Sequence, residues 1–317
     1  MIDQYGRDIT YLRISVTDKC NLRCRYCMPE EGVCRRRHAE MMTEDELITA
    51  VEAAASLGIR KLRITGGEPL VKKNILSICR RAAAVEGIDE LCLTTNGTLL
   101  PQMAAQLKEA GVKRLNLSLD TLDPEKYAYI TRIGRLEDFH AGLEAALDAG
   151  FEKLKVNAVL IGGFNEDEIA PLANLTRAYP LDMRFIELMP MLSSEAFGPG
   201  AYVPVSKVLE ALPEAAAVPQ DGGVAKLYRL PGAKGNIGLI SPVSAHFCGT
   251  CNRLRLTADG KLKACLHAAE ECSVRGMDFA QVRAVMENII WNKPAWHGDL
   301  DAQHPSRAGR NMNEIGG

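Results

Sequence analysis

Hydrophobic and polar positions follow two alternating periods along the first 190 residues. Short apolar segments, typical of buried strands, occupy 11–16, 61–65, 91–95, 114–119, 153–160 and 183–188. Between them, apolar residues recur with helical spacing at 44–57, 75–85, 101–110, 136–149 and 167–178. Thr43-Glu44-Asp45-Glu46 is a capping-box signature before the first of these helices. The pattern predicts six β-α units around a mostly parallel sheet.

Polar segments follow the predicted strands, at 65–68, 94–97, Ser118 and 189–190. Such a sheet either stays open and doubly wound or closes partly into a barrel, and both types bind ligands at the carboxyl ends of their strands. The repeated polar rim favours the barrel. We therefore expect an α/β fold, with an incomplete (β/α)6 TIM-type barrel over residues 1–190.

The composition and the order of predicted elements change after Pro190. Residues 191–223 are rich in Pro, Gly, Ala and Ser, which indicates a connector. Two strand pairs follow, 225–230 with 236–241 and 253–257 with 261–265, and Asp259-Gly260 marks a tight turn in the second pair. A smaller C-terminal α+β domain is therefore expected over 224–317.

Composition narrows the range of partners. A chain of 317 residues that is 47% hydrophobic and 25% charged has the balance of an ordinary globular protein. Its formal net charge of −2 argues against nucleic acid, so that an anionic ligand must meet a local basic cluster. The sequence has neither a membrane-length apolar run nor a signal segment, so we expect a cytoplasmic protein without a membrane partner. Ten cysteines in that setting favour metal ligands over disulfides.

The most informative cysteines are Cys20, Cys24 and Cys27, in C-x3-C-x2-C spacing. Three thiolates on one short loop can each bind one iron of a [4Fe-4S] cube, which leaves the fourth iron open to a small molecule. An electron carrier normally supplies four cysteines per cube, and three-cysteine zinc sites need an added ligand such as histidine. The spacing therefore favours a cluster that takes part in chemistry.

A second triplet, Cys248, Cys251 and Cys265, has C-x2-C-x13-C spacing. It suits either a zinc site completed by His246 or His267, or a second cube with one open iron. Two triplets that are each one ligand short favour paired clusters. The sequence assigns no role to Cys34 or Cys272.

The first triplet, with Gly66-Gly67-Glu68-Pro69 after the second strand, resembles the radical S-adenosylmethionine (SAM) superfamily. Within it the chain resembles the GTP 3′,8-cyclase family, a lyase family that performs the first step of molybdenum cofactor (molybdopterin) biosynthesis. The similar segments are 11–21, 63–69, 94–97, 116–120, 184–189, 247–256 and the terminal Gly316-Gly317. They run along almost the whole chain.

The resemblance implies a role for each matching residue. One [4Fe-4S] cluster would be held by Cys20, Cys24 and Cys27, and the other by Cys248, Cys251 and Cys265. SAM, the cosubstrate, would contact Tyr26, Gly67, Ser118 and Met189. GTP would bind Arg13, Arg63, Thr94, Lys155, Arg253, Leu254 and Arg255. Arg13 and the Gly316-Gly317 tail would act in catalysis.

The resemblance also implies a reaction. A 5′-deoxyadenosyl radical would abstract hydrogen from ribose C3′ of GTP, and closure on guanine C8 with reduction would give (8S)-3′,8-cyclo-7,8-dihydroguanosine 5′-triphosphate. An external one-electron reductant, a homodimer and a functional link to cyclic pyranopterin monophosphate synthase follow as expectations. The alternatives are another two-cluster radical SAM enzyme with a peptide substrate and a non-catalytic zinc-binding module.

Overall fold

The computed structural model describes residues 1–317 except 33–39, 221, 302 and 317. Two positions singled out in the sequence, Cys34 and Gly317, therefore lie outside the described residues.

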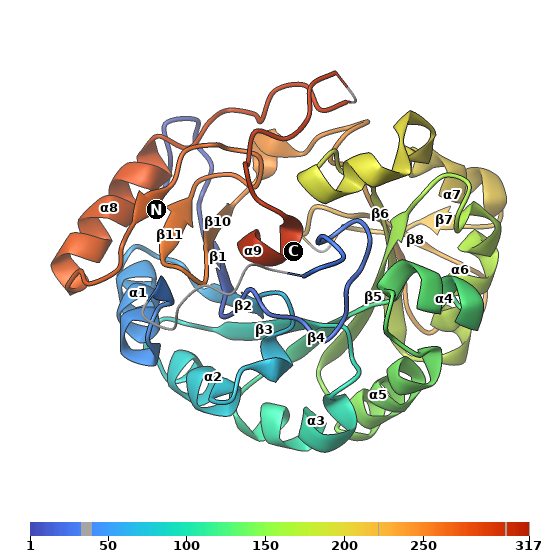
Figure 1. The fold of residues 1–317 in the computed structure, drawn as a ribbon, viewed down its shortest axis with the longest axis horizontal. Helices are drawn as coiled ribbons and strands as arrows, with labels where there is room; N and C mark the ends of the chain where they lie inside the picture. Colours follow the sequence, from blue (N-terminus) through green and yellow to red (C-terminus); the bar gives the residue numbers. More distant parts are fainter. Residues whose placement is uncertain (33–39, 221, 302, 317) are drawn as a thin grey trace.

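A curved parallel sheet forms the centre of the molecule, with helices around its outer face (Figure 1). Its six consecutive strands are β1 (Tyr11–Ser15), β2 (Lys61–Thr65), β3 (Glu90–Thr95), β4 (Arg114–Ser118), β5 (Lys153–Leu160) and β6 (Leu181–Glu187). The helices between them are α1 (Glu44–Ser56), α2 (Ile75–Ala83), α3 (Leu100–Glu109), α4 (Pro124–Thr131), α5 (Leu136–Asp148) and α6 (Ile169–Ala178). The predicted incomplete β/α barrel is confirmed.

Helix ends follow local chemistry. The predicted capping box before α1 is present: Thr43 Oγ1 accepts from the Glu46 amide, and Glu46 accepts from the Thr43 amide. Helix α6 begins later than predicted, because Glu166–Glu168 form a 3₁₀ turn before it. Helix α4 was not predicted, although Asp123-Pro124 is a start signal and the Asp123 carboxylate accepts from the Glu125 amide.

The two predicted hairpins are confirmed, and their strands continue the barrel sheet at both edges. Strand β10 (Arg253–Leu256) pairs parallel with β1, followed by β11 (Lys261–Lys263) and β12 (Cys272–Ser273). At the other edge β9 (Ile237–Ile240) pairs parallel with β6, followed by β8 (Lys226–Arg229) and β7 (Ala216–Ala217). One sheet thus includes strands from both sides of residues 190 and 223. The domain boundaries at these two positions stay a prediction.

In the described residues after β6, the α-helices are α7 (Ser206–Ala211), α8 (Phe279–Trp291) and α9 (Met312–Ile315). The short α7 lies in the connector, close to where a helix was expected. Helix α8 covers the β10–β11 edge and packs against α1 (Figure 1). Helix α9 and the C-terminus lie inside the ring of strands and helices rather than on its outside (Figure 1).

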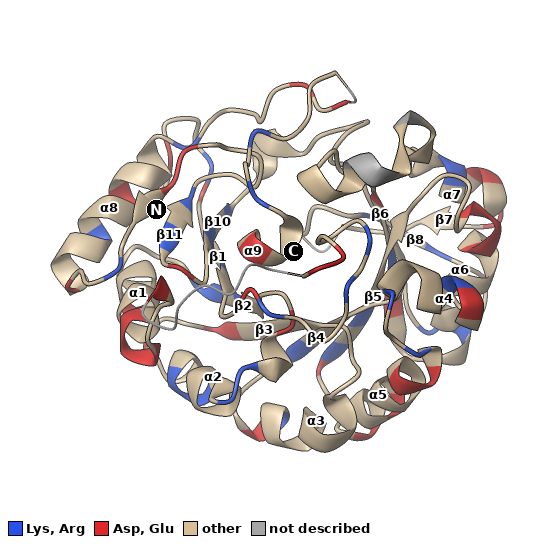
Figure 2. Cartoon of the chain, in the orientation of Figure 1, with Lys and Arg blue, Asp and Glu red and all other residues tan. Residues whose placement is uncertain are grey.

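The two faces of the sheet differ in polarity. On β1, Leu12 and Ile14 are fully buried in the apolar core shared with α1. Because side chains alternate along a strand, Arg13 between them faces the barrel interior. Lysines and arginines recur on several strands of the curved sheet (Figure 2). The fold therefore places an apolar core outside the sheet and basic groups inside it.

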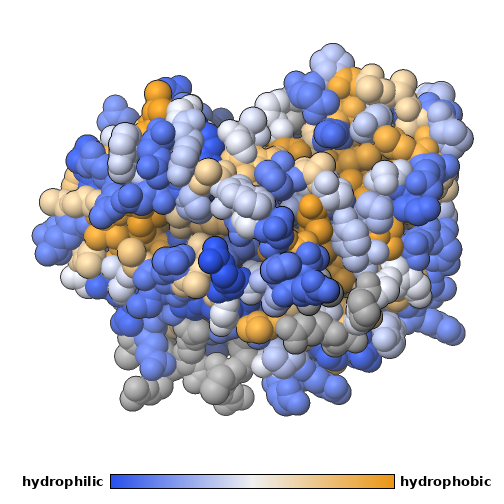
Figure 3. Space-filling view, turned by 90° about the horizontal axis from the view of Figure 1, so that it is seen from above, coloured by the Kyte–Doolittle hydropathy of each residue, from blue (hydrophilic) through white to orange (hydrophobic). Residues whose placement is uncertain are grey.

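The exterior is mainly hydrophilic on the side shown in Figure 3, where hydrophobic residues form separate small areas. Among the described residues, none of the helices has both the length and the apolar character needed to cross a membrane.

Candidate active site

The first cysteine triplet lies on a tight loop that follows β1. The Cys27 amide donates to the Cys24 carbonyl oxygen (2.9 Å), as does the Met28 amide (3.1 Å). All three thiols are free. Burial and the neighbouring Cys27 charge raise the pKa of Cys24, while burial and the Cys20 charge raise the pKa of Cys27 to about 12. Three thiols whose charges repel one another at close range fit a cationic cluster that would bind them as thiolates.

The second triplet converges around the start of β10, the strand that pairs in parallel with β1. Burial and the charges of Cys265 and Cys251 raise the pKa of Cys248. Burial alone would also raise the pKa of Cys251, but the positive charges of Lys293 and Arg253 outweigh it and lower that pKa. These three thiols also fit a cationic group, in a more basic setting than the first triplet.

A cube and a single zinc ion place different demands on three cysteines. Zn²⁺ draws its sulfur ligands to about 2.3 Å from one centre, whereas each cysteine of a cube meets its own iron. Within the described part of the chain, no three or more His, Cys, Asp or Glu side chains are grouped for a single metal ion.

The Gly66-Gly67-Glu68 segment crosses directly beneath the first cysteine loop. The Gly67 amide donates to the Thr17 carbonyl oxygen and the Glu68 amide to the Lys19 carbonyl oxygen, each at 2.8 Å. A Cβ on Gly67 would overlap the Lys19 carbonyl and lie 2.7 Å from the Asp18 carbonyl oxygen. The glycine therefore permits a backbone crossing that positions the cysteine loop.

Replacing Gly67 with alanine should disturb this crossing and lower iron loading at the first triplet. We expect a loss of roughly half the cluster, because backbone on both sides of the contact would have to move. Iron content and visible absorbance after anaerobic reconstitution measure the effect. Gly200→Ala is the control, since a Cβ there meets no atom within 4 Å and the residue lies outside both triplets. Equal loading in both variants would contradict the prediction.

Glu68 links three loops at the carboxyl ends of the strands through hydrogen bonds, a role that was not predicted from the sequence. Its fully buried carboxylate accepts from Thr95 Oγ1 and from the Asn96 amide, each at 2.8 Å. Asn96 Nδ2 in turn donates to Asn21 Oδ1 (2.8 Å), inside the cysteine loop. Burial raises the pKa of Glu68 to about 7. The glutamate thus holds the loops after β2 and β3 against the cysteine loop.

The predicted SAM residues lie at the carboxyl ends of the strands or on the loops that follow them. Tyr26 Oη donates to Asp120 Oδ2 (2.8 Å), and burial raises the pKa of that aspartate to about 6. Ser118 ends β4, where it lies opposite Asn157 of β5. Met189 follows β6 and packs on the apolar cluster that includes Ile315 of α9. Together with Gly67 they lie along the rim formed by the carboxyl ends of the strands.

Four of the predicted GTP residues face the barrel interior, three from the neighbouring strands β10, β1 and β2 and one from β5. Arg13 is in register with Arg63 of β2 and with Arg255 of β10, while Lys155 lies on β5. Arg63, Lys155 and Arg255 are buried. Burial lowers the pKa of Arg255 to about 10, and the charge of Arg253 acts in the same direction. Buried cations that destabilise one another form a site that an anion would stabilise.

The pKa of Tyr11 reflects the positive charge of the arginines in the barrel interior. Burial by itself raises a phenol pKa, but the positive charges of Arg63, Arg13 and Arg253 outweigh it and lower the pKa of Tyr11 to about 8. Arg63 Nε donates to its hydroxyl oxygen. Lysine and arginine charge therefore dominates this part of the interior.

The remaining predicted GTP residues are Thr94, Arg253 and Leu254; the first two have side chains near the basic cluster, and the third does not. Arg63 Nη1 donates to Thr94 Oγ1 (3.3 Å), which places that hydroxyl beside the basic cluster. Arg253 lies over the rings of Tyr11 and Phe247, and its buried Nε has no acceptor among the described residues. The Leu254 side chain is fully buried in the core opposite Leu12, so only its backbone can face the interior.

The C-terminal tail enters the same interior. Arg255 Nη1 donates to the Gly316 carbonyl oxygen. Gly316 has φ of 83°, and a Cβ there would overlap Thr65 Oγ1 and lie 3.2 Å from Ser15 Cβ. Asn313 Nδ2 donates to the Asp18 carbonyl oxygen (3.1 Å), beside the first cysteine loop. The tail therefore bridges the first cysteine loop and the basic cluster.

Sequence reasoning missed three buried cations that support this site. Arg184 lies on β6 in register with Asn157 and is buried. A charged residue within an otherwise apolar strand was the sequence signal that could have identified it. Lys293 Nζ donates to the Arg253 carbonyl oxygen (2.9 Å), and Arg7 Nη1 donates to the Cys248 carbonyl oxygen (2.9 Å). No local pattern distinguishes these last two from exposed basic residues.

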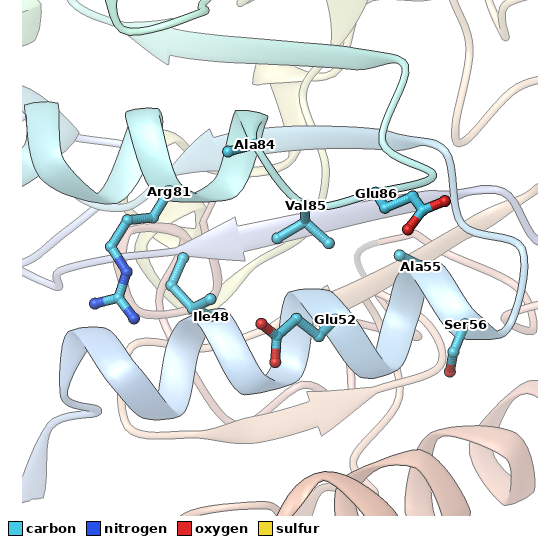
Figure 4. Close-up of a pocket in the computed structure, with 8 residues that line it drawn as sticks. All are labelled: Ile48, Glu52, Ala55, Ser56, Arg81, Ala84, Val85 and Glu86. Atoms are coloured by element: carbon cyan, nitrogen blue, oxygen red, sulfur yellow. The ribbon is translucent and has the colours of Figure 1, made fainter.

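A groove of about 600 Å³ lies outside the barrel, between α1 and the segment from α2 to Glu86 (Figure 4). Its lining residues are Ile48, Glu52, Ala55, Ser56, Arg81, Ala84, Val85 and Glu86. It holds neither a cysteine nor any of the predicted site residues. The chemistry-bearing groups are concentrated in the barrel interior instead.

Comparison with known proteins agrees with this arrangement. Residues 14–176 match the radical SAM superfamily, and residues 181–298 match the family described as Molybdenum Cofactor Synthesis C. GTP 3′,8-cyclases from Pelotomaculum thermopropionicum and Heliobacterium modesticaldum are 48% and 45% identical to this chain, with all of both proteins covered in each case.

Solved structures show the same fold at lower identity. Streptococcus suis SuiB, solved with the precursor peptide SuiA, matches with a TM-score of 0.66 and 14% identity, covering 92% of this chain and 66% of that one. Methylornithine synthase matches with a TM-score of 0.51 and 16% identity, over 65% of this chain and 62% of that one. With this fold, both cysteine triplets and full-length relatives, the chain belongs to the radical SAM superfamily and, within it, to the GTP 3′,8-cyclase family of molybdenum cofactor biosynthesis.

Proposed function

We propose that this chain converts GTP into (8S)-3′,8-cyclo-7,8-dihydroguanosine 5′-triphosphate with two [4Fe-4S] clusters, one for SAM and one for the substrate. Family membership carries the radical SAM chemistry and the link to molybdenum cofactor biosynthesis. The single structural observation behind the substrate assignment is the basic inner face, where Arg13, Arg63 and Arg255 lie side by side in register. A triphosphate carries the negative charge and the phosphate oxygens that such a face is suited to bind.

Cys20, Cys24 and Cys27 would hold the SAM cluster, and Tyr26, Gly67, Ser118 and Met189 would surround SAM. Bound there, cluster and SAM supply the one-electron chemistry that yields a 5′-deoxyadenosyl radical. The protein's own contribution is positional. Glu68 fixes the loops after β2 and β3 against the cysteine loop, and Asp120 orients Tyr26 through its hydroxyl.

The triphosphate would lie on Arg13, Arg63, Lys155 and Arg255, with Thr94 as a hydroxyl partner. Arginine's planar fork suits bidentate contacts with phosphate oxygens. Burial strengthens each contact, because little water competes inside the barrel. These residues would thereby fix the ribose in reach of the SAM site.

Cys248, Cys251 and Cys265 would hold the second cluster, near the guanine base. Arg253 starts β10 beside this triplet and presents a buried Nε without a described acceptor, which suits a polar group of the substrate. Gly316 and Gly317 would complete the reacting end of the site, since Arg255 already holds the Gly316 carbonyl there. We also propose an external one-electron reductant, a homodimer and a cytoplasmic location. The product would pass to cyclic pyranopterin monophosphate synthase.

Anaerobic turnover of the reconstituted protein with GTP, SAM and dithionite tests the proposal. Mass spectrometry should detect 5′-deoxyadenosine and the cyclised nucleotide, both dependent on GTP. Deoxyadenosine without a GTP-derived product would indicate a different substrate, such as a peptide. Zinc in place of iron, with neither product, would contradict the radical mechanism.

Replacing Arg63 with glutamine should weaken GTP binding without removing the clusters. Loss of a charge-assisted contact is worth about 1.5–3 kcal/mol, which corresponds to a rise in KM of roughly 10–100-fold. Arg60→Gln is the matched control, because Arg60 is exposed and lies just before the same strand. A KM for GTP that is equal in both variants would remove Arg63 from the binding site.

A further inference from the structure

Arg310 lies just before the C-terminal tail and makes a double ion pair that the reaction chemistry leaves unexplained. Its Nε and Nη2 donate to the two carboxylate oxygens of Glu271 at 2.7 and 2.6 Å. Its Nη1 and Nη2 donate to the carboxylate of Asp259 at 3.2 and 3.0 Å. The three side chains are only 12–17% exposed. One guanidinium therefore engages two carboxylates bidentately, with little solvent to weaken either pair.

The two acidic partners belong to the edge of the sheet that carries the substrate-side residues. Asp259 lies in the turn after β10, the strand of Arg253 and Arg255, and accepts from Thr257 Oγ1 (2.6 Å). Glu271 precedes β12 and also accepts from the fully buried Lys263 (2.9 Å), two residues before Cys265. Arg310 is thus fixed to the part of the sheet that positions the second triplet.

The tail that follows Arg310 is anchored at successive points up to Gly316. Asn311 Oδ1 accepts from Ser193 Oγ (2.5 Å), and Asn313 donates to the Asp18 carbonyl oxygen. Ile315 is buried with Met191 and Ala308. The contacts described for these later residues are single hydrogen bonds or small apolar contacts, whereas Arg310 forms ion pairs with two carboxylates at the tail's base.

We propose that Arg310 is a positioning residue, which holds residues 311–316 inside the barrel so that Gly316 stays against Arg255. This inference rests on the proposed function and deepens it, since it assigns the docking of the tail to one ion-pair network. Without Arg310 the tail should leave the interior for part of the time, while both cysteine triplets and the SAM rim remain in place. Product formation should then fail to keep pace with SAM cleavage.

The test compares Arg310→Gln, Arg310→Lys and two matched controls in anaerobic turnover and hydrogen–deuterium exchange. Arg307→Gln changes an exposed arginine of the same segment. Arg81→Gln removes another arginine that pairs with two acids, Glu44 and Asp45. Arg81 lines the groove outside the barrel (Figure 4). The readouts are the ratio of cyclised nucleotide to 5′-deoxyadenosine, iron content, the unfolding midpoint and amide exchange in the C-terminal peptide.

Arg310→Gln should lower that ratio by roughly a hundredfold, because small misplacements at a reacting centre have effects of that size. Its C-terminal peptide should exchange faster, with iron content kept. Arg310→Lys should recover part of the ratio, and both controls should match the parent. If Arg310→Gln left both the product ratio and the amide exchange of the C-terminal peptide unchanged, the proposal would be overturned. A loss of iron and of stability in parallel with the loss of product would also overturn it. If the parent itself made no cyclised nucleotide, the proposed function would fail, while the exchange data would still decide the docking role.

Discussion

A chain shortened by Gly316 and Gly317 should retain both clusters and SAM binding but form no cyclised nucleotide. The tail lies inside the barrel, where Arg255 donates to the Gly316 carbonyl. Its removal exposes Arg255, a predicted GTP ligand, and opens the reacting end to water. Anaerobic turnover should therefore show a drop in product of at least roughly a hundredfold. Iron content and SAM affinity, measured on the same samples, should remain at the parent's values.

A point variant separates the shape of the tail from its length. Gly316→Ala keeps the full chain but places a Cβ against Thr65 Oγ1 at a φ of 83°. Gly298→Ala imposes a similar backbone strain at a φ of 87°, where a Cβ meets no atom within 4 Å. We expect loss of product only in the first variant. Full activity of the shortened chain would place the tail outside the reaction.

The second large effect is expected at the cysteines. Two cubes hold about eight irons, so Cys24→Ala and Cys251→Ala should each lower the content to about four. Cys24→Ala should also abolish 5′-deoxyadenosine formation, because SAM would lose its iron. Cys251→Ala should keep that formation and abolish the cyclised nucleotide. This asymmetry assigns one triplet to SAM and the other to the substrate.

Cys272→Ala provides the control for this series, since Cys272 is an exposed cysteine outside both triplets. It should keep about eight irons and full turnover. Iron and product that persist in Cys251→Ala would refute a second cluster at that triplet. Stoichiometric zinc at Cys248, Cys251 and Cys265 in anaerobically purified protein would support the alternative zinc site instead.

Local patterns were sufficient for the elements that a few neighbouring residues control. Strands β2 and β5 have their predicted bounds, because alternating or continuous apolar residues and flanking turns are local signals. The start of α1 follows from the Thr43–Glu46 capping box. Cysteine spacing alone identified both triplets. Such features depend on contacts within a few positions along the chain.

The tertiary structure decided what depends on distant contacts. The hairpins were predicted, but their attachment to β1 and β6 needed the edges of the assembled sheet, and parallel pairing leaves no local signal. Burial likewise separates Lys293 and Arg310 from exposed lysines and arginines. Only the fold shows that Gly316 lies against Thr65 and Arg255. The sequence thus determined which chemical groups are available. Contacts between residues far apart in the chain determined which of these groups meet, because close contact at one site reflects packing of the whole barrel.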